Sequence, residues 1–398
     1  MSDETSVEVG QRAAREAERR MLIGGELVEA SSGEEFDNLS PATGAVLGTT
    51  AAAGERDMNR AIDAARTAFD TTDWSTNRAL RKRCLEQLQA ALDAEKEYLR
   101  GELVAEVGCP VMTTESAQLD WPLAESLRYP AYLIDAFEWE RILDGGGLFG
   151  DRNIRTVVKE AVGVVAAVTP SNFPIEVILN KLGPALAAGN TVVLKPDPHT
   201  PWNATRLGRI VAENTDIPPG VVNVVPTPSN DVAGLLADDP RVDMVSFTGS
   251  TAVGKLLMRR GADSMKRMFL ELGGKSAAIV LDDANPAVIV PTALGVCVHA
   301  GQACAATSRM LIHRSLYDQA VADITLAYQH VPVGDPVDPG TLVGPVISAA
   351  QKDRVLSAID GARRDGAEIT AGGGPVDGLP DHLAGGHYVA PTVVVGAD

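Results

Sequence analysis

Three short segments of this 398-residue chain carry side chains that could act together on a reactive carbonyl carbon. The segment VTPSNFP places Asn172 in a proline-punctuated loop after an apolar run. The segment FLELGGK holds a single acid, Glu271, before a glycine pair, and the segment GQAC ends in Cys304. The sequence therefore offers an amide, a carboxylate and a thiol, each at the end of an apolar stretch.

Taken singly, each of these side chains has an ordinary interpretation. Cys304 would be a small core residue, Asn172 a turn or cap residue, and Glu271 a helix cap or an ion-pair partner. Taken together, they match the covalent oxidation of an aldehyde. A soft nucleophile attacks the carbonyl carbon while an amide and a backbone N–H stabilise the oxyanion. A carboxylate in an apolar setting has its pKa raised toward the range of a general base.

The apolar runs around these segments predict the scaffold that positions them. Four short runs, over 162–168, 191–194, 221–225 and 242–247, each end in Pro, Gly, Ser or Thr, and helical stretches lie between them. Such alternation predicts parallel βαβ units and an α/β fold with a doubly wound sheet. A further strand is expected over 276–281, and strand runs alternate with helices again toward the end of the chain.

Helices and one projecting element are expected elsewhere. Residues 57–70 and 79–107 place apolar side chains three and four positions apart, which predicts amphipathic helices. Residues 284–308 contain no Asp, Glu, Lys or Arg, but Pro, Asn, His and Gln interrupt the apolar runs. A long buried helix leading into a polar loop is therefore a better interpretation than a membrane span. Residues 138–161 are typical of a hairpin with two polar arms around a glycine-rich turn.

Two glycine-rich patterns resemble nucleotide-binding motifs. Gly145, Gly147 and Gly150 match G-x-G-x-x-G, but that motif needs a buried strand before it, a helix after it and an acid about 20 positions on. The hairpin turn explains these glycines better. Residues 249–255 (GSTAVGK) resemble a P-loop, but Leu256 stands where a Ser or Thr must ligate magnesium. The start of the helix after this turn could still hold a phosphate with its backbone N–H groups and positive dipole end.

The composition excludes several partners and compartments. The formal net charge of −18 makes nucleic acid an unlikely partner, because the chain repels phosphate backbones. Four cysteines exclude a disulfide scaffold and fit a reducing cytosol. The first twenty residues mix both charges and lack the apolar run of a signal peptide, so a cytoplasmic location and no membrane partner are predicted.

Together with several other motifs, the three segments described first make the chain resemble the aldehyde dehydrogenase superfamily. The resemblance is carried by several long motifs that occur in the same order as in the family, which makes it far more specific than any single pattern. In chain order, these motifs are residues 22–26 (LIGGE), 38–44 (NLSPATG), 181–190 (KLGPALAAGN), 193–196 (VLKP), 247–251 (FTGST), 271–276 (ELGGKS), 301–304 (GQAC) and 342–345 (LVGP).

The resemblance assigns catalytic roles. Cys304 would be the nucleophile that forms a thiohemiacetal and then a thioester, and Asn172 with the Cys304 backbone N–H would form the oxyanion hole. Glu271 would activate the water that hydrolyses the thioester, which is typical of the acid-forming branch of the family. Lys181 would assist proton movement near Glu271, unless it is an ordinary solvated lysine on a helix surface.

The resemblance also implies a cofactor, NAD or in its place NADP, and a small-molecule aldehyde substrate. Lys195 would contact the adenosine ribose and Ser250 the pyrophosphate. The other cofactor-binding residues that the resemblance implies are Gly249, Thr169, Pro170, Ser171 and Leu272. No metal is expected, since the spacing of Cys297, His299 and Cys304 matches no common zinc pattern and a metal would quench the nucleophile.

The sequence departs from the family pattern at several positions. Ser171 stands where members usually have Trp. Pro198, beside Asp197, stands where they usually have a Glu that binds the ribose 2′-hydroxyl and repels a 2′-phosphate, so the choice between NAD and NADP is open. Residues 227–229 (TPS) replace common glycines near the adenine pocket. Family chains also continue beyond the equivalent of Asp398, so we expect this sequence to be C-terminally truncated relative to the family.

The expected organisation follows from these comparisons of motifs. A Rossmann-like coenzyme domain would comprise 1–137 and 162–272, a hairpin over 138–161 would serve oligomerisation, and 273–398 would be an incomplete α/β catalytic domain. The family implies a homodimer or homotetramer. Two alternatives stay open: a coenzyme A-acylating relative, and a truncated, inactive paralogue that only binds nucleotide or partners.

Overall fold

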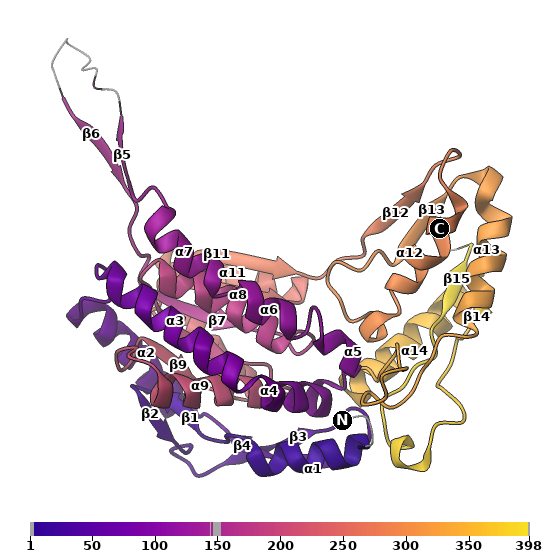
Figure 1. The fold of residues 1–398 in the computed structure, drawn as a ribbon, viewed down its shortest axis with the longest axis horizontal. Helices are drawn as coiled ribbons and strands as arrows, with labels where there is room; N and C mark the ends of the chain where they lie inside the picture. The colour runs from indigo at the N-terminus through magenta and orange to yellow at the C-terminus, as the bar shows by residue number, and fades with distance from the viewer. Residues whose placement is uncertain (1–3, 144, 146–152, 397–398) are drawn as a thin grey trace.

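A seven-stranded sheet forms the centre of the larger part of the molecule. The computed structural model describes residues 4–143, 145 and 153–396 (Figure 1). The strand order is β11-β10-β7-β8-β9-β1-β2, in which the first five strands are parallel and β1 and β2 are antiparallel. The strands are β1 (Met21–Ile23), β2 (Glu26–Val28), β7 (Val164–Val168), β8 (Thr191–Lys195), β9 (Val222–Val224), β10 (Met244–Gly249) and β11 (Arg267–Leu272).

Helices cover both faces of this sheet, as the alternation of strand and helix predicts. In β8, Val192 and Leu194 belong to one apolar core and Val193 to the other, because successive side chains of a strand point to opposite faces. The first core includes α3 (Arg78–Ala94), α7 (Arg128–Ala136), α8 (Pro174–Ala187) and α9 (Trp202–Asn214). The second includes α2 (Glu55–Thr71), α10 (Asn230–Asp238) and α11 (Thr251–Gly261). The doubly wound α/β fold is therefore confirmed.

The prediction of one helix over 79–107 is wrong in one respect, because the helix is interrupted at Glu95. There α3 ends and α4 (Lys96–Glu102) begins, followed by a π-helical turn over Leu103–Val107. The carboxylate of Glu95 lies 2.8 Å from Arg206 and 2.5 Å from Arg209, both on α9. These ion pairs hold the break against a neighbouring helix. The remaining elements of the N-terminal part are α1 (Ser6–Glu16), β3 (Glu35–Leu39), β4 (Val46–Ala51), α5 (Val111–Thr114) and α6 (Asp120–Glu125).

The expected hairpin is present and projects from the body of the protein (Figure 1). Its arms are β5 (Glu140–Leu143) and β6 (Arg155–Val158), which pair antiparallel and whose side chains are mostly exposed. Two of the three fingerprint glycines, Gly147 and Gly150, lie outside the described residues. The arms confirm that residues 138–161 contain a hairpin.

The C-terminal part of the chain forms a smaller α/β unit beside the large sheet (Figure 1). Its strands pair as β12 with β13 in parallel and β14 with β15 antiparallel, and its apolar cluster is separate from the two cores of the sheet. Its elements are β12 (Ala277–Val280), α12 (Ile289–Gly295), β13 (Arg309–Ile312), α13 (Arg314–Tyr328), α14 (Ala349–Arg364), β14 (Glu368–Ala371) and β15 (Val393–Val395).

The uncharged segment 284–308 does not form the long helix that we expected. It contains only the seven-residue α12, with 3₁₀ turns over Pro286–Val288 and Val298–Gly301. The helix α12 ends at Gly295, and the backbone becomes left-handed at His299, where φ is 54°, so no α-helix continues into the segment that carries Cys304. Over the ranges that the structure describes, there is no helix long and apolar enough to cross a membrane.

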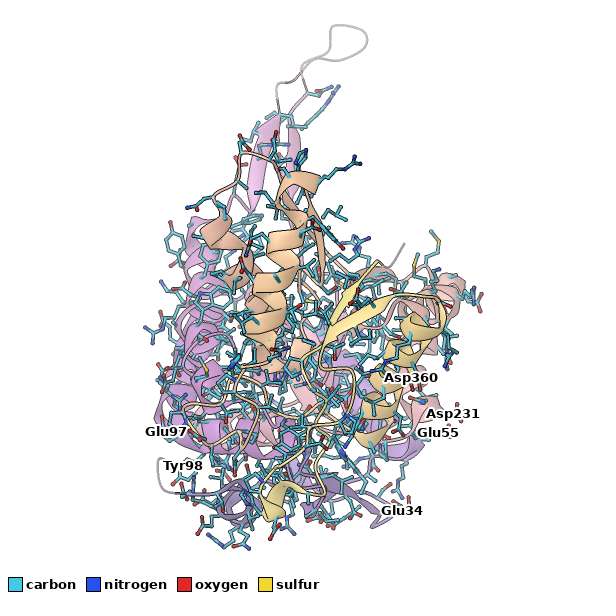
Figure 2. The ribbon with its side chains drawn as sticks, turned by 90° about the vertical axis from the view of Figure 1, so that its right-hand side faces the viewer. Glu34, Glu55, Glu97, Tyr98, Asp231 and Asp360 are labelled. Atoms are coloured by element: carbon cyan, nitrogen blue, oxygen red, sulfur yellow. The ribbon has the colours of Figure 1, made fainter. Side chains whose placement is uncertain are left out.

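The surplus of acidic residues lies on the outside of the molecule. Glu34, just before β3, Glu55 on α2 and Asp231 on α10 are exposed, and Figure 2 shows these side chains at the periphery of the ribbon. Part of the negative charge is therefore carried by well-separated surface positions, while a few acids, such as Glu102 and Glu106, are buried.

Candidate active site

The topology of the sheet defines one place where a ligand would bind. From β7 the chain moves outward through β8 and β9, then returns past β7 to form β10 and β11 on the other side. In open α/β sheets, ligands bind at the carboxyl ends of the strands where this reversal occurs. Thr169 follows β7 and Ser250 follows β10, and these two strands are neighbours. The fold therefore brings the predicted cofactor residues to one edge of the sheet.

The residues at this edge fit a dinucleotide. Ser250 caps α11, and its Oγ accepts a hydrogen bond from Val253 N at 3.3 Å, while the exposed first turn of the helix leaves backbone N–H groups for a phosphate. Next to it, Gly249 ends β10. Thr169 Oγ1 is buried and has no hydrogen-bond partner within the described part of the chain. An unsatisfied buried hydroxyl at this edge of the sheet is consistent with a polar ligand.

The other predicted cofactor residues flank this edge. Lys195 ends β8, and its carbonyl accepts a hydrogen bond from Thr169 N at 3.2 Å. Burial lowers the pKa of the Lys195 ammonium, and the nearby Asp197 carboxylate opposes that shift. Pro170 and Ser171 are half-buried in the loop after β7. Leu272 ends β11 with its side chain packed into the core, so only its backbone faces the site.

The loop after β7 contacts the loop that carries the thiol. The side-chain amide of Asn172 donates a hydrogen bond to the carbonyl of Gln302 at 2.6 Å, and Cys304, two residues later, is exposed. On the other side, a Cβ added to Gly274 would lie 3.4 Å from the Cys304 carbonyl oxygen. The three segments that the sequence singled out therefore meet around Cys304.

Lys181 is buried rather than solvated on a helix surface. Its Nζ donates to Ser246 Oγ at 2.9 Å and lies 5.9 Å from the centre of the Phe269 ring. Burial lowers the pKa of Lys181 to about 8, and attraction to the Glu271 carboxylate acts in the opposite direction. The interpretation of Lys181 as a residue near Glu271 is thus consistent with the structure.

Glu271 is not in the apolar setting that we expected, because its side chain is exposed. Side chains of a strand alternate, so the leucines on either side of Glu271 face the core while Glu271 faces away from it. Phe269, two positions earlier on the same face, is 49% exposed. The apolar neighbours in the sequence therefore do not surround the carboxylate in space.

Three residues that contact Asn172 or the loop of Cys304 were given no such role from the sequence. Gln118 and His299 both bond to the Asn172 backbone carbonyl, with nitrogen–oxygen distances of 2.8 Å and 2.9 Å. The side chain of Gln302 bridges the carbonyls of His299 and Pro345 and the N–H of Ile347. One signal was available for His299: it directly precedes an Ala-Gly pair in a turn region, and His is enriched among left-handed residues.

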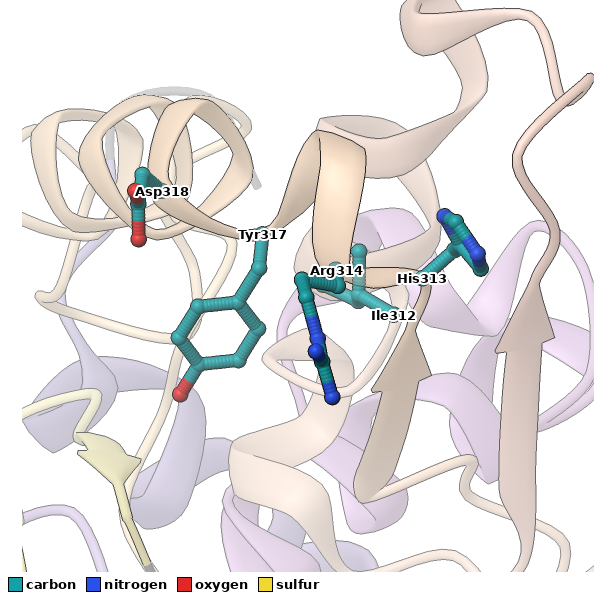
Figure 3. A pocket seen from close by; sticks show the side chains of 5 residues that line it. All are labelled: Ile312, His313, Arg314, Tyr317 and Asp318. Carbon is teal, nitrogen blue, oxygen red and sulfur yellow. The ribbon is translucent and has the colours of Figure 1, made fainter.

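Two further observations concern a surface hollow outside the site and the possibility of a bound metal ion. A shallow hollow of about 710 Å³ lies where β13 meets α13 and is lined by Ile312, His313, Arg314, Tyr317 and Asp318 (Figure 3). None of the residues assigned to chemistry lines it. Across residues 4–143 and 153–396, no three His, Cys, Asp or Glu side chains converge in a way that could hold a metal ion.

Comparison with known proteins assigns the class. The sequence model described as the aldehyde dehydrogenase family matches residues 27–398. A putative aldehyde dehydrogenase, DhaS of Bacillus subtilis, is 37% identical over 378 residues, which covers 94% of this chain and 74% of that protein. The 2-hydroxymuconic semialdehyde dehydrogenase of Pseudomonas putida is 35% identical and covers 95% of this chain and 78% of its own length.

A solved structure supports the same assignment. Betaine aldehyde dehydrogenase of Staphylococcus aureus in complex with NAD⁺ superposes with a TM-score of 0.92 at 30% identity, covering 98% of this chain and 77% of the other. The chain belongs to the aldehyde dehydrogenase family. Its activity class is accordingly the NAD(P)-dependent oxidation of an aldehyde, as the motifs predicted.

Proposed function

We propose that this chain oxidises its aldehyde by the hydrolytic route, with Cys304 as the nucleophile. The observation that carries the proposal is the 2.6 Å hydrogen bond from Asn172 to the Gln302 carbonyl, which ties an oxyanion donor to the loop of an exposed thiol. The Cys304 thiolate adds to the aldehyde carbon, a C–S bond forms, and the carbonyl electrons move to oxygen. Asn172 and the Cys304 backbone N–H donate to that oxyanion.

The oxidation step follows from this thiohemiacetal. When bound, the dinucleotide accepts the hydride. The oxyanion electrons re-form the C=O bond as the hydride leaves carbon, and the product is a thioester on Cys304. Glu271 then takes a proton from water, which attacks the thioester carbon. The C–S bond breaks, the Cys304 thiolate is restored, and the product leaves as the carboxylic acid, which loses its second proton to solvent and becomes the carboxylate.

Lys181 receives the proton that Glu271 has taken. An amine whose pKa is about 8 exchanges protons near neutral pH, and its attraction to Glu271 shows that the two groups are close enough to influence each other. Ser246, which accepts from Lys181 at 2.9 Å, orients the amine. The proton therefore leaves the site through a buried base instead of returning to the thiolate.

The cofactor is held at the edge formed by β7, β8 and β10. Lys195 contacts the adenosine ribose, Ser250 and Gly249 contact the pyrophosphate, and the backbone of residues 169–171 and Leu272 lines the nicotinamide end. Since Pro198 replaces the acid that would repel a 2′-phosphate, we expect measurable activity with NADP as well as NAD. Comparing kcat/KM for the two cofactors tests this.

The organisation of the chain is proposed on the same basis. Residues 1–137 and 162–272 form the coenzyme domain, and 273–398 belong to the catalytic domain, in line with the separate apolar clusters. The hairpin over 138–161 is an oligomerisation arm, since Ile142 is 75% and Ile154 84% exposed on it. We propose a homodimer or homotetramer in the cytoplasm. Replacing both isoleucines by Glu should lower the mass measured by light scattering.

One assay separates the proposal from its alternatives. The chain is incubated with NAD and a panel of aldehydes, with and without coenzyme A, and NADH and the acid are quantified. We expect NADH and free acid without coenzyme A, and no NADH from Cys304→Ser, which should still bind NAD. NADH that forms only with coenzyme A would show an acylating enzyme. No NADH under either condition, with NAD still bound, would show an inactive paralogue.

A further inference from the structure

His299 adopts a backbone conformation that needs support from its surroundings. His299, Ala300 and Gly301 have φ values of 54°, 53° and 72°, so three successive residues are left-handed just before the nucleophile. Only glycine takes this conformation without strain, and strained residues persist when neighbouring contacts hold them. The His299 side chain is 1% exposed, and its ring lies edge-on to Phe173 with 5.4 Å between ring centres.

The hydrogen bonds of His299 fix its protonation. A backbone carbonyl can only accept, so the His299 Nε2 that lies 2.9 Å from Asn172 O must carry the proton. His299 Nδ1 is buried and has no partner among the residues that the structure describes. Burial also lowers the pKa of His299 to about 4, which the bond to Asn172 partly opposes, so the ring is neutral at pH 7. The ring is therefore a fixed hydrogen-bond donor and does not serve as a base.

Asn172 is held at both its backbone and its side chain. Its carbonyl accepts from His299 Nε2 and from Gln118 Nε2, which uses both lone pairs. Its amide nitrogen has two hydrogens, and one of them is donated to Gln302 O. The other hydrogen remains for an oxyanion. The Gln302 side chain donates in turn to the His299 carbonyl at 3.2 Å, which closes a ring of three residues.

We propose that His299 is a positioning residue for the oxidation step. By donating to the Asn172 backbone from within the nucleophile loop, it fixes the distance between Cys304 and the oxyanion donor before substrate binds. This inference rests on the proposed function, because it gives Asn172 the role of oxyanion donor. It goes beyond that function by naming the residue on which the geometry of the donor depends.

Three substitutions of His299 distinguish positioning from a merely structural role. His299→Gln places an amide N–H where Nε2 lies, whereas His299→Asn is too short to reach and His299→Phe keeps the ring without a donor. Asn tolerates the left-handed backbone better than Gln or Phe. If His299 only supported the left-handed backbone, His299→Asn would therefore be more active than His299→Gln. If His299 positions Asn172, His299→Gln will be the more active variant.

Steady-state NADH formation gives the first readout. We expect His299→Phe and His299→Asn to lose about 10²-fold in kcat, the scale of a misplaced catalytic group, with KM nearly unchanged. His299→Gln should stay within about tenfold of the unmodified chain, since its donor is retained. His330→Phe, an exposed histidine at the end of α13, is the matched control and should keep full activity. Activity higher for Asn than for Gln, or unaffected by Phe, would overturn the inference.

A second readout does not depend on turnover. The side-chain amide of Asn172 is followed by hydrogen exchange in protein labelled with ¹⁵N-asparagine, and its signal is assigned by loss in Asn172→Asp. We expect slow exchange in the unmodified chain and in His299→Gln, and fast exchange in the Phe and Asn variants. Equal protection in all four proteins would refute the inference. If the unmodified chain makes no NADH, the proposed function fails, and this measurement still decides the role of His299.

Discussion

The amide of Asn172 lies 2.6 Å from the carbonyl of Gln302, although 130 residues separate them in the chain. One residue follows strand β7, and the other precedes Cys304 by two positions. The contact therefore joins the coenzyme-binding part of the protein to the part that bears Cys304. It also leaves one amide hydrogen of Asn172 free to meet the negative oxygen of a reacting aldehyde.

Removal of that amide should slow catalysis without unfolding the protein. We expect Asn172→Ala to lower kcat about 10²- to 10³-fold, which is typical of losing one oxyanion donor. Steady-state NADH formation and NAD binding measure the two effects. Asn180→Ala, an exposed asparagine on α8, is the control and should leave kcat unchanged. Equal losses of kcat in both variants would argue against the assigned role.

Replacement of Glu271 should separate oxidation from hydrolysis. In Glu271→Gln, the thiohemiacetal still forms and transfers its hydride, but no carboxylate deprotonates the water that attacks the thioester. We expect a rapid burst of about one NADH per site, as expected when an acyl-enzyme accumulates, followed by a slow steady rate. Stopped-flow absorbance detects the burst, and mass spectrometry detects the acylated Cys304. A normal steady rate would mean that another group serves as the base.

The rate of thioester hydrolysis should depend on the ionisation of Lys181. Burial lowers the pKa of Lys181 to about 8. Only the neutral amine can accept a proton, so the hydrolysis rate should rise as pH increases through about 8 and then level off. Lys181→Met should remove this inflection and lower the plateau. Single-turnover hydrolysis, followed from pH 6 to pH 10, provides the test, and an unchanged profile in the variant would exclude Lys181 from the proton path.

Glu106 should make the protein less stable at alkaline pH. It is fully buried in the π-helical turn, and burial, reinforced by repulsion from Glu102, raises its pKa from 4.5 to about 8. A raised pKa means that the folded state binds the proton more tightly than the unfolded state. The stabilising contribution is therefore complete below pH 4.5 and is lost as pH rises through about 8.

The variant Glu106→Gln tests this, because it removes the titrating carboxyl and keeps its shape; its one amide oxygen still accepts from Asn203 N, while the bond from Trp202 N, which goes to the other oxygen of Glu106, is lost. The side chain of Asn38 can rotate to accept from the new amide, since its Oδ1 has no partner in the described part of the protein. We expect the Tm of the unmodified chain to fall by several degrees between pH 6 and pH 9, and that of the variant to fall less. Glu34→Gln, on the exposed surface, should follow the unmodified chain.

Much of the scaffold could be predicted because its signals are local. The buried runs of β7, β8, β9 and β10 consist of valine-rich stretches bounded by turn residues, and each was placed to within a few residues. The break at Glu95 could not be predicted, since the apolar spacing continues through it. The carboxylate at the break is bound by a pair of arginines on α9, more than a hundred residues away in the chain, and such a contact leaves no local signal.

The candidate residues of the site could be picked out from the sequence, but the exposure and the contacts of each residue could not. Asn172 and Cys304 were singled out by residue type and motif, and the structure brings their loops together. The exposure of Glu271 was missed, because a run of apolar residues in a sequence says nothing about which side of a strand each one faces. His299 was considered only as a metal ligand, since its contact with Asn172 exists only once the two loops have met.

The large separation in sequence between Asn172 and Cys304 also has a consequence for how the protein is synthesised. The strand β7 and its loop leave the ribosome long before Cys304 does, and the apolar core packed against that strand consists of residues that also precede Cys304. The thiol acquires its neighbouring amide only after the later residues have docked onto that sheet. Under the proposed mechanism, a nascent or half-folded chain therefore has a thiol without its oxyanion donor, and it gains the power to attack aldehydes only as folding of the chain is completed.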